Sequence, residues 1–520
     1  MATSYPEHSL HYTLMTDPQP KVKVLFERPA TPRRWPRVLL WVLVIGALMR
    51  IPAELAMVWL RYYTEANYDR CVARIRARGE PLAWKDFPRP SVPDEQNAAL
   101  LYIQAMGAPI VRSSSPSRFG PDEPPEVRRL AVLWDGSWKW MPHPKDREEH
   151  YEEVQAMHLA SRDLLDLCRR ARQREGVDWK LRLTGQPPAL ALPAPADEIS
   201  NHMRPMELLE LAAWYAHRNG DDANSLEYVR DLLAFARSDY RLPGLLHTNL
   251  AERAEGMAMW HLMRLAGAIS LSGDPSDAKR RSVGALISDL LNDRVTREGW
   301  VLGMMGERAF AYSAIEQTYA PLRRTGRTSA IDMSRMPWEV RLSESFFRAA
   351  FAIDSMRLLS YIDRQVALPR QPDYARAKAL GPTLVLPESR LGRTTCFLTA
   401  TFACSWAGNI ERCFSSIALR RLAAAGLAIR MYQADHGGKR PATLEELVPD
   451  YLPAVPVDPF AADGRAIRYE PNRLEPLLYS VYKDGKDDGG DFTRIDGRIR
   501  HFDEPDLIFL LDGDEPAPPR

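Results

Sequence analysis

Four aspartates fall within eight residues near the C-terminus, in the stretch "VYKDGKDDGGD" (481–491). They are Asp484, Asp487, Asp488 and Asp491. The interleaved glycines let carboxylates and carbonyl oxygens converge, and Ca²⁺ takes about six to eight oxygens at about 2.3–2.6 Å. This pattern predicts a calcium site, and a solvated acidic turn is the alternative. An EF-hand is excluded, because Lys486 and Ile495 occupy the third and twelfth positions of such a loop.

The remaining residues show no catalytic signature. The sequence contains no H-E-x-x-H zinc-protease motif and no G-x-S-x-G motif of a hydrolase nucleophile. It also contains no Walker phosphate-binding loop and no G-x-G-x-x-G dinucleotide-binding motif after a strand. His150 and His158 would lie about two helical turns apart, too far to share a metal, so we expect exposed or hydrogen-bonded histidines. The cluster "LWDGSWKWMP" (133–142) is either a sugar-stacking patch or a packed loop. Its tryptophans are Trp134, Trp138 and Trp140.

Composition bounds the class of protein. The chain has 520 residues, and its 69 Lys and Arg residues balance 68 Asp and Glu residues, so no global field attracts nucleic acid. The five cysteines include no C-x-x-C pair, which excludes a zinc knuckle and a thioredoxin-type site. Disulfides among Cys396, Cys404 and Cys413 are one alternative, and buried free thiols are the favoured one.

The most apolar stretch runs from Val38 to Leu60 and is long enough to span about 30 Å of bilayer as a helix. Arg50 and Glu54 interrupt it at a spacing that lets them pair. A basic cluster abuts its N-terminal end, which predicts a cytoplasmic N-terminus and a retained anchor. That cluster is Arg33, Arg34 and Arg37. A cleaved signal peptide and a core helix are the alternatives.

From Asn97 to about residue 410 the apolar residues recur with the period of an α-helix. One helix is expected on each side of Gly220. Gly220 would cap the C-terminus of the first helix, and the second would begin at Ser225. Further helices are expected around 246–270, 277–292, 299–320 and 341–366. Proline-rich stretches at 107–125 and 183–198 are expected to be surface loops. The pattern predicts an irregular α-helical array, because no sustained repeat is present.

The last hundred residues change character. The stretch "SSIALRRLAAAGLAIRMYQADHGG" (415–438) places five apolar or small residues on one buried helical stripe: Ala418, Leu422, Ala425, Ile429 and Tyr432. Thr443 and Glu446 then form a capping box for a short helix. Strands are expected at 466–470, 477–483, 498–502 and 506–511, the first two as a hairpin.

This order of elements resembles the globular head of the major pseudopilin of bacterial type II secretion systems. The matching stretches are "MYQADHGGKRPATLEEL", "YLPAVPVDPF" and "YSVYKDGKDDGGD", which cover about 413–495. The resemblance implies that the aspartate-rich loop binds Ca²⁺, with Asp484 as the best-matched ligand. In this chain Tyr482 replaces the family's glycine and disfavours a positive φ. The stretch 73–105 is similar to the juxtamembrane region of uncharacterised bacterial membrane proteins.

These observations predict a mainly α protein with an N-terminal transmembrane helix, an irregular α-helical array and a small α+β head with antiparallel strands. The expected parts are a cytoplasmic tail (1–37), a membrane helix (38–60), a juxtamembrane segment (61–96), an ectodomain (97–412) and the head (413–520). We expect a single-pass protein of the bacterial inner membrane with a periplasmic bulk, which binds envelope proteins or scaffolds them without catalysis. An accessory component of a type II secretion or pilus-like assembly, and an envelope hydrolase, are the alternatives.

Overall fold

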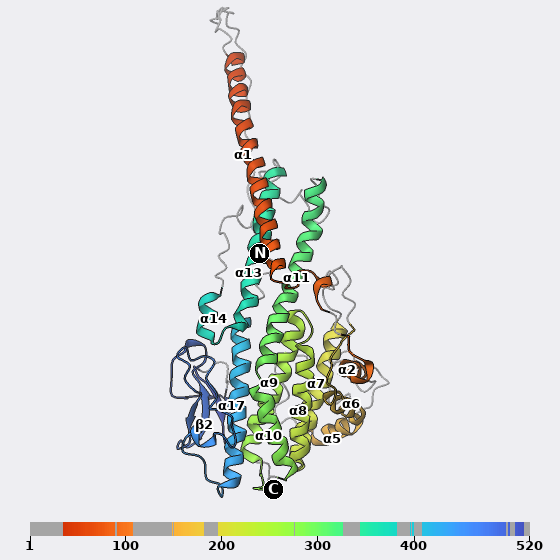
Figure 1. Cartoon of the computed structure of the whole chain (residues 1–520), viewed down its shortest axis with the longest axis vertical. Coiled ribbons are helices and arrows are strands. Elements are labelled where there is room, and N and C mark those ends of the chain that lie inside the picture. The colour runs from red at the N-terminus through yellow and green to blue at the C-terminus, as the bar shows by residue number, and fades with distance from the viewer. Residues whose placement is uncertain are drawn as a thin grey trace, which may run out of the picture. The chain divides into compact units, whose positions relative to one another are not determined.

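A computed structural model describes residues 35–88, 91–107, 148, 150–180, 196–274, 276–325, 344–381, 396, 398–399, 408–495, 498–499 and 505–513. These residues are mainly helical and include a small antiparallel sheet, which confirms the predicted mainly α class (Figure 1). The chain divides into two compact units, Met1–Ala56 and Met57–Arg520. The domain boundaries expected at 60/61, 96/97 and 412/413 stay predictions.

Helix α1 (Trp35–Ala77) contains the apolar stretch expected to cross a membrane. Among the residues that the structure describes, no helix combines the length and the apolar character that a membrane crossing requires. In the second unit, the C-terminal half of α1 packs through Tyr68, whose ring meets that of Tyr319 edge-on. The Tyr68 hydroxyl donates a hydrogen bond to Glu316, so this half of α1 is fixed against α11 (Arg294–Thr325).

The helical array follows the expected period closely. Its longest members pack side by side, α7 against α8, α8 against α9, and α11 against α13 (Figure 1). The remaining helical bounds are α2 (Ala98–Met106), α5 (Tyr151–Ala160), α6 (Arg162–Arg172), α7 (Ala196–Arg218), α8 (Asp222–Asp239), α9 (Leu245–Ala268), α10 (Ala278–Leu291), α13 (Glu344–Ala367) and α14 (Tyr374–Leu380). The four helices expected between 246 and 366 are confirmed within a few residues at each end.

Local capping explains most of these boundaries. Gly220 has a φ of +77°, which confirms that it ends α7. The next helix begins earlier than expected, because Asp221 rather than Ser225 is its N-cap and accepts from the Asn224 amide. Asp277 caps α10 in the same way, through the Lys279 and Arg280 amides.

Helix α17 (Asn409–Asp435) joins the helices to the sheet. The predicted stripe is buried except at Tyr432, which is half-buried. Every other position from Cys413 to Ile429 except Arg421 is buried as well. The reason is that α17 packs against α9 and α10 on one side and against β2 and β5 on another. Gly426 permits the second contact, since a Cβ there would lie 2.6 Å from the Phe509 ring. One continuous core therefore runs from the helices to the sheet.

The sheet has the order β1 (Arg468–Glu470), β2 (Leu477–Ser480), β5 (Leu507–Leu510), with both pairings antiparallel. The expected hairpin is confirmed. A separate pair joins β3 (Arg494–Ile495) to β4 (Arg498–Ile499). The short helix after Thr443 is a 3₁₀ turn (Leu444–Leu447), in which the Thr443 side chain makes no capping bond. Only the acidic half of the predicted box forms, with Glu446 accepting from the Ala442 amide.

Two further expectations concern the cysteines and the cluster of tryptophans. Four of the five cysteines are buried free thiols, as favoured from the sequence. These are Cys71, Cys168, Cys396 and Cys413, whereas Cys404 lies outside the described residues. The tryptophans Trp134, Trp138 and Trp140, and nearly all of the proline-rich stretches, also lie outside the described residues.

Candidate functional site

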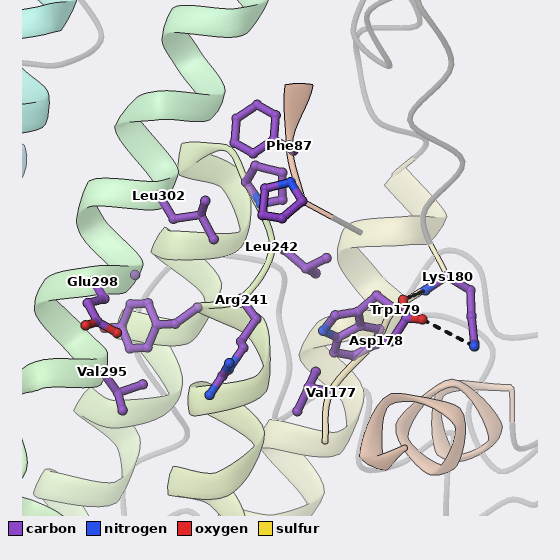
Figure 2. Close-up of a pocket in the computed structure, with 14 residues that line it drawn as sticks. Phe87, Val177, Asp178, Trp179, Lys180, Arg241, Leu242, Val295, Glu298 and Leu302 are labelled. Atoms are coloured by element: carbon purple, nitrogen blue, oxygen red, sulfur yellow. Dashed lines mark hydrogen bonds and ion pairs between the residues drawn. The ribbon is translucent and has the colours of Figure 1, made fainter. Parts of the chain in front are cut away.

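A cavity of about 550 Å³ opens where α8 turns into α9, opposite α11 (Figure 2). Aromatic side chains form much of its wall: Phe87, Trp179 and Tyr240. Val177, Leu242, Val295 and Leu302 complete an apolar lining. Gly299 allows the Tyr240 ring to pack directly on α11, since a Cβ at this position would lie 2.2 Å from that ring. A mainly apolar cavity of this size, with few polar groups, is typical of small-molecule sites.

Four charged residues accompany this apolar lining. Lys180 lies 3.2 Å from the Asp178 carboxylate (Figure 2), and Glu298 accepts a 2.7 Å hydrogen bond from Arg294. Arg241, in contrast, makes no side-chain hydrogen bond or ion pair with any residue that the structure describes. The cavity therefore offers one guanidinium that is available to an anionic group.

A cluster of two histidines and one aspartate lies directly beside this cavity. His202 comes from α7, Asp239 ends α8 and His247 lies in the first turn of α9. One ligand atom from each of the three lies within 4.8 Å of the other two. We call these three residues the His–Asp cluster. It adjoins the cavity through Trp179, whose ring lies 5.3 Å from that of His202.

Two members of the His–Asp cluster, His202 and Asp239, are buried, and His247 is half-buried. Asp239 is fully buried, and both its oxygens approach the same Nδ1 of His202, at 3.2 and 3.4 Å. Burial raises the pKa of the Asp239 carboxyl, while the hydrogen bond from His202 opposes this shift. Burial, with a smaller contribution from His202, lowers the pKa of His247 to about 3. His247 is therefore a neutral imidazole at pH 7, and its enclosed Nδ1 has no hydrogen-bond partner in the described part of the chain.

A second set of buried polar side chains surrounds Glu255, in the middle of α9. Its carboxylate accepts from Arg420 at 2.5 Å, from Thr296 at 2.9 Å and from Ser416 at 2.5 Å. Tyr240 donates a fourth hydrogen bond at 3.0 Å. The guanidinium of Arg420 also donates to the carbonyl oxygens of Asp289, Leu290 and Asn292. We call these contacts the Glu255–Arg420 network.

The aspartates expected to bind calcium are placed differently from one another. Asp487 accepts from Tyr479 and Arg468, both at 2.9 Å, and Asp491 accepts from Arg473 at 2.8 Å. Asp484 accepts from the Lys486 amide within its own turn. Each of these three carboxylates already has a partner in this structure, which fits the acidic-turn alternative. The calcium site itself stays a prediction.

Asp506 is the residue near this loop that sequence reasoning missed. It is fully buried at the start of β5; its Oδ2 accepts from the Gly490 amide, and its Oδ1 has no partner among the described residues. Burial, with additional repulsion from Asp488 and Asp487, raises the pKa of Asp506 to about 6. The sequence feature that could have identified this buried carboxylate is its position directly before the apolar run "LIFLL".

Tyr482 has a left-handed backbone, although a side chain at this position was expected to disfavour one. Its φ is +46°. Tertiary contacts stabilise this conformation, because the buried ring packs edge-on against Phe460 and the hydroxyl donates to Glu411 at 3.0 Å. A buried tyrosine therefore adopts the left-handed conformation at this turn.

The two histidines considered from the sequence do not come together as a site. His150 precedes α5, and its Nδ1 lies 3.9 Å from Glu153. His158 stacks on Tyr215 with 4.6 Å between ring centroids, and its enclosed Nδ1 has no partner among the described residues. The expectation of hydrogen-bonded histidines is therefore wrong for this nitrogen.

Comparisons with models of protein families, with curated proteins and with solved structures find no match for this chain. The resemblance of 413–495 to a pseudopilin head consequently rests on its residues alone. Any functional conclusion must come from the chemistry of the sites described above.

Proposed function

We propose that the helical region is a non-catalytic binding module for a small amphipathic anion, which enters the cavity beside Trp179. The observation that carries this proposal is the combination of an apolar wall with the unpaired guanidinium of Arg241. An apolar ligand body would replace water against Phe87, Trp179 and Leu302. Its anionic group would pair with Arg241 through charge-assisted hydrogen bonds, which are stronger than neutral ones.

The proposal also places this module in the bacterial envelope, with the apolar part of α1 as an inner-membrane anchor and the bulk of the chain in the periplasm. Its support is the basic cluster before Val38 and the exposure of apolar side chains in α1, such as Trp41 (65%) and Leu43 (64%). Alkaline phosphatase fused after Arg520 is expected to be active. An inactive fusion, together with a fluorescent green-protein fusion that glows, would reverse the orientation.

The binding test uses 2-naphthoate as an anionic probe and 2-naphthylmethylammonium as its cationic counterpart. Titration calorimetry on the full-length protein is expected to show tighter binding of the anion. Arg241→Gln should weaken 2-naphthoate binding by about tenfold, because one charge-assisted hydrogen bond contributes about 1.5 kcal/mol. Leu302→Trp, which fills the cavity, should abolish binding of both probes.

Arg281→Gln is the matched control, because Arg281 is an exposed arginine of α10 that does not line the cavity. It should bind 2-naphthoate as the native chain does. Equal affinity of the native chain for the two probes, or unchanged affinity in Arg241→Gln, would refute the anionic part of the proposal. Unchanged binding in Leu302→Trp would refute the cavity as the site.

A further inference from the structure

The His–Asp cluster is assembled by tertiary structure rather than by a local motif. His202 and Asp239 belong to neighbouring antiparallel helices, α7 and α8, which the turn at Gly220 brings side by side. His247 arrives after a second tight turn, in which Gly244 has a φ of +108°. The three side chains thus come from three rigid helices, and sites on helices are held more precisely than sites on loops.

The distances suit a small cation with nitrogen and oxygen ligands. Zinc binds histidine nitrogen at about 2.0–2.1 Å and carboxylate oxygen at about 2.0–2.2 Å, so tetrahedral ligand atoms lie about 3.3 Å apart. The His202 Nδ1 and Asp239 Oδ1 atoms are 3.2 Å apart already. The remaining pairs lie within 4.8 Å, so rotamer adjustments of about 1 Å would complete three corners of a tetrahedron.

Two polar groups of the cluster also lack a full set of hydrogen-bond partners among the described residues. Asp239 is fully buried and receives its hydrogen bonds from a single nitrogen among the described residues. The enclosed Nδ1 of His247 has no partner among the residues that the structure describes. A buried carboxylate and an enclosed imidazole nitrogen in this condition cost free energy unless another group satisfies them. A divalent cation would satisfy both at once.

We propose that His202, Asp239 and His247 bind a divalent transition-metal ion of the zinc class. Two imidazoles and one carboxylate favour Zn²⁺ and Co²⁺ over Ca²⁺ and Mg²⁺, which prefer oxygen ligands alone. The bound ion would also fix the imidazole on which Trp179 packs, and hence one wall of the cavity.

The test titrates Co²⁺ into the full-length protein after dialysis against a chelator. We expect one Co²⁺ per chain, with the visible absorption of a four-coordinate site, and displacement by Zn²⁺. Because Trp179 packs on His202, bound Co²⁺ should quench its fluorescence, and this quenching should be absent in Trp179→Phe. His247→Ala and Asp239→Asn should each weaken binding by at least about 100-fold.

His158→Ala is the matched control, because His158 is a histidine with an enclosed, unpartnered Nδ1 that has no place in the cluster. It should bind Co²⁺ as the native chain does. Circular dichroism checks that each variant keeps its helices, and Asp239→Asn, which is nearly isosteric, keeps the test decisive if His247→Ala unfolds.

Several outcomes would overturn the proposal. A native chain that binds no stoichiometric Co²⁺ would mean that the three residues are only a buried His–Asp hydrogen bond beside a third imidazole. Unchanged affinity in Asp239→Asn, or quenching that persists equally in Trp179→Phe, would place the ion elsewhere.

Discussion

The Glu255–Arg420 network and the His–Asp cluster are both buried, both use α9, and differ in how completely their polar groups are paired. Glu255 receives four hydrogen bonds from Arg420, Thr296, Ser416 and Tyr240, whereas Asp239 receives bonds from one nitrogen among the described residues. A fully paired buried charge is expected to hold elements together. An incompletely paired one stores unfavourable free energy that a ligand can release. The first is therefore assigned to structure and the second to binding.

The largest predicted effect comes from breaking the paired cluster. Arg420→Met leaves the buried Glu255 without its cation, so the free energy of unfolding should fall by about 3–5 kcal/mol. Urea unfolding of the full-length protein measures this loss. Arg294→Met is the matched control, because its pair with Glu298 is exposed to solvent. A loss as small as that of the control would mean that the network contributes little to stability.

The second prediction concerns Glu207 of α7, which is an intermediate case. Burial raises its pKa to about 7, and Arg253, at 3.8 Å, offsets only part of the shift. A carboxyl whose pKa is higher in the folded state stabilises the fold below the unfolded pKa of 4.5. That stabilisation, about 3 kcal/mol, is lost as the pH rises towards 7.

Glu207→Gln tests this prediction, because glutamine mimics the protonated acid. Urea unfolding at pH 4, below the unfolded pKa, should give the variant and the native chain similar stability. At pH 7.5 the variant should be the more stable by about 3 kcal/mol. The same difference at both pH values would show that Glu207 titrates normally.

The third prediction concerns the loop at 484–491, which would be a second cation site, separate from the His–Asp cluster. The unpartnered Oδ1 of Asp506, beside Asp487 and Asp488, is the feature that favours calcium there. At a Ca²⁺ concentration 100 times the Kd, the full-length protein should gain about 2.7 kcal/mol over its stability in chelator.

Asp506→Asn should lose this calcium-dependent gain, because it removes a charged ligand from the site. Glu475→Gln, at an acidic position outside the loop, is the control and should retain the gain. If the native chain unfolds at the same urea concentration with Ca²⁺ and with chelator, the stretch is a solvated acidic turn.

The smallest predicted effect lies at the end of α17. Asp435 pairs with Arg280 of α10 at 2.6 Å, so α17 and α10 are joined here near the surface. Asp435→Asn should cost about 0.5–1 kcal/mol, since solvent screens the pair. A cost close to that of Arg420→Met would show that burial is not what distinguishes the two contacts.

The sequence predicts the helices well, because a period of 3.6 residues follows from burial of one face. It could not predict the full burial of α17, since a single stripe does not reveal that a sheet covers another side. The left-handed backbone at Tyr482 was missed for a similar reason: contacts with Phe460 and Glu411 override the local preference.

The candidate sites were harder to predict than the fold. The aspartate-rich loop is visible because its residues are neighbours in sequence. The residues of the His–Asp cluster are widely spaced on three helices, and neither imidazole belongs to a known motif. Only the packing of α7, α8 and α9 brings them together, so no local pattern could have shown this site.

The link between Glu255 and Arg420 also has a consequence for synthesis of the chain. The two residues lie 165 positions apart. At about 5–20 residues per second, the ribosome makes Arg420 roughly 8–33 s after Glu255. During that interval α9 carries a carboxylate that cannot be buried without its cation, so its packing against α8 must remain loose. Termination of translation before α17 would therefore leave an open helical array rather than a finished one that merely lacks its sheet.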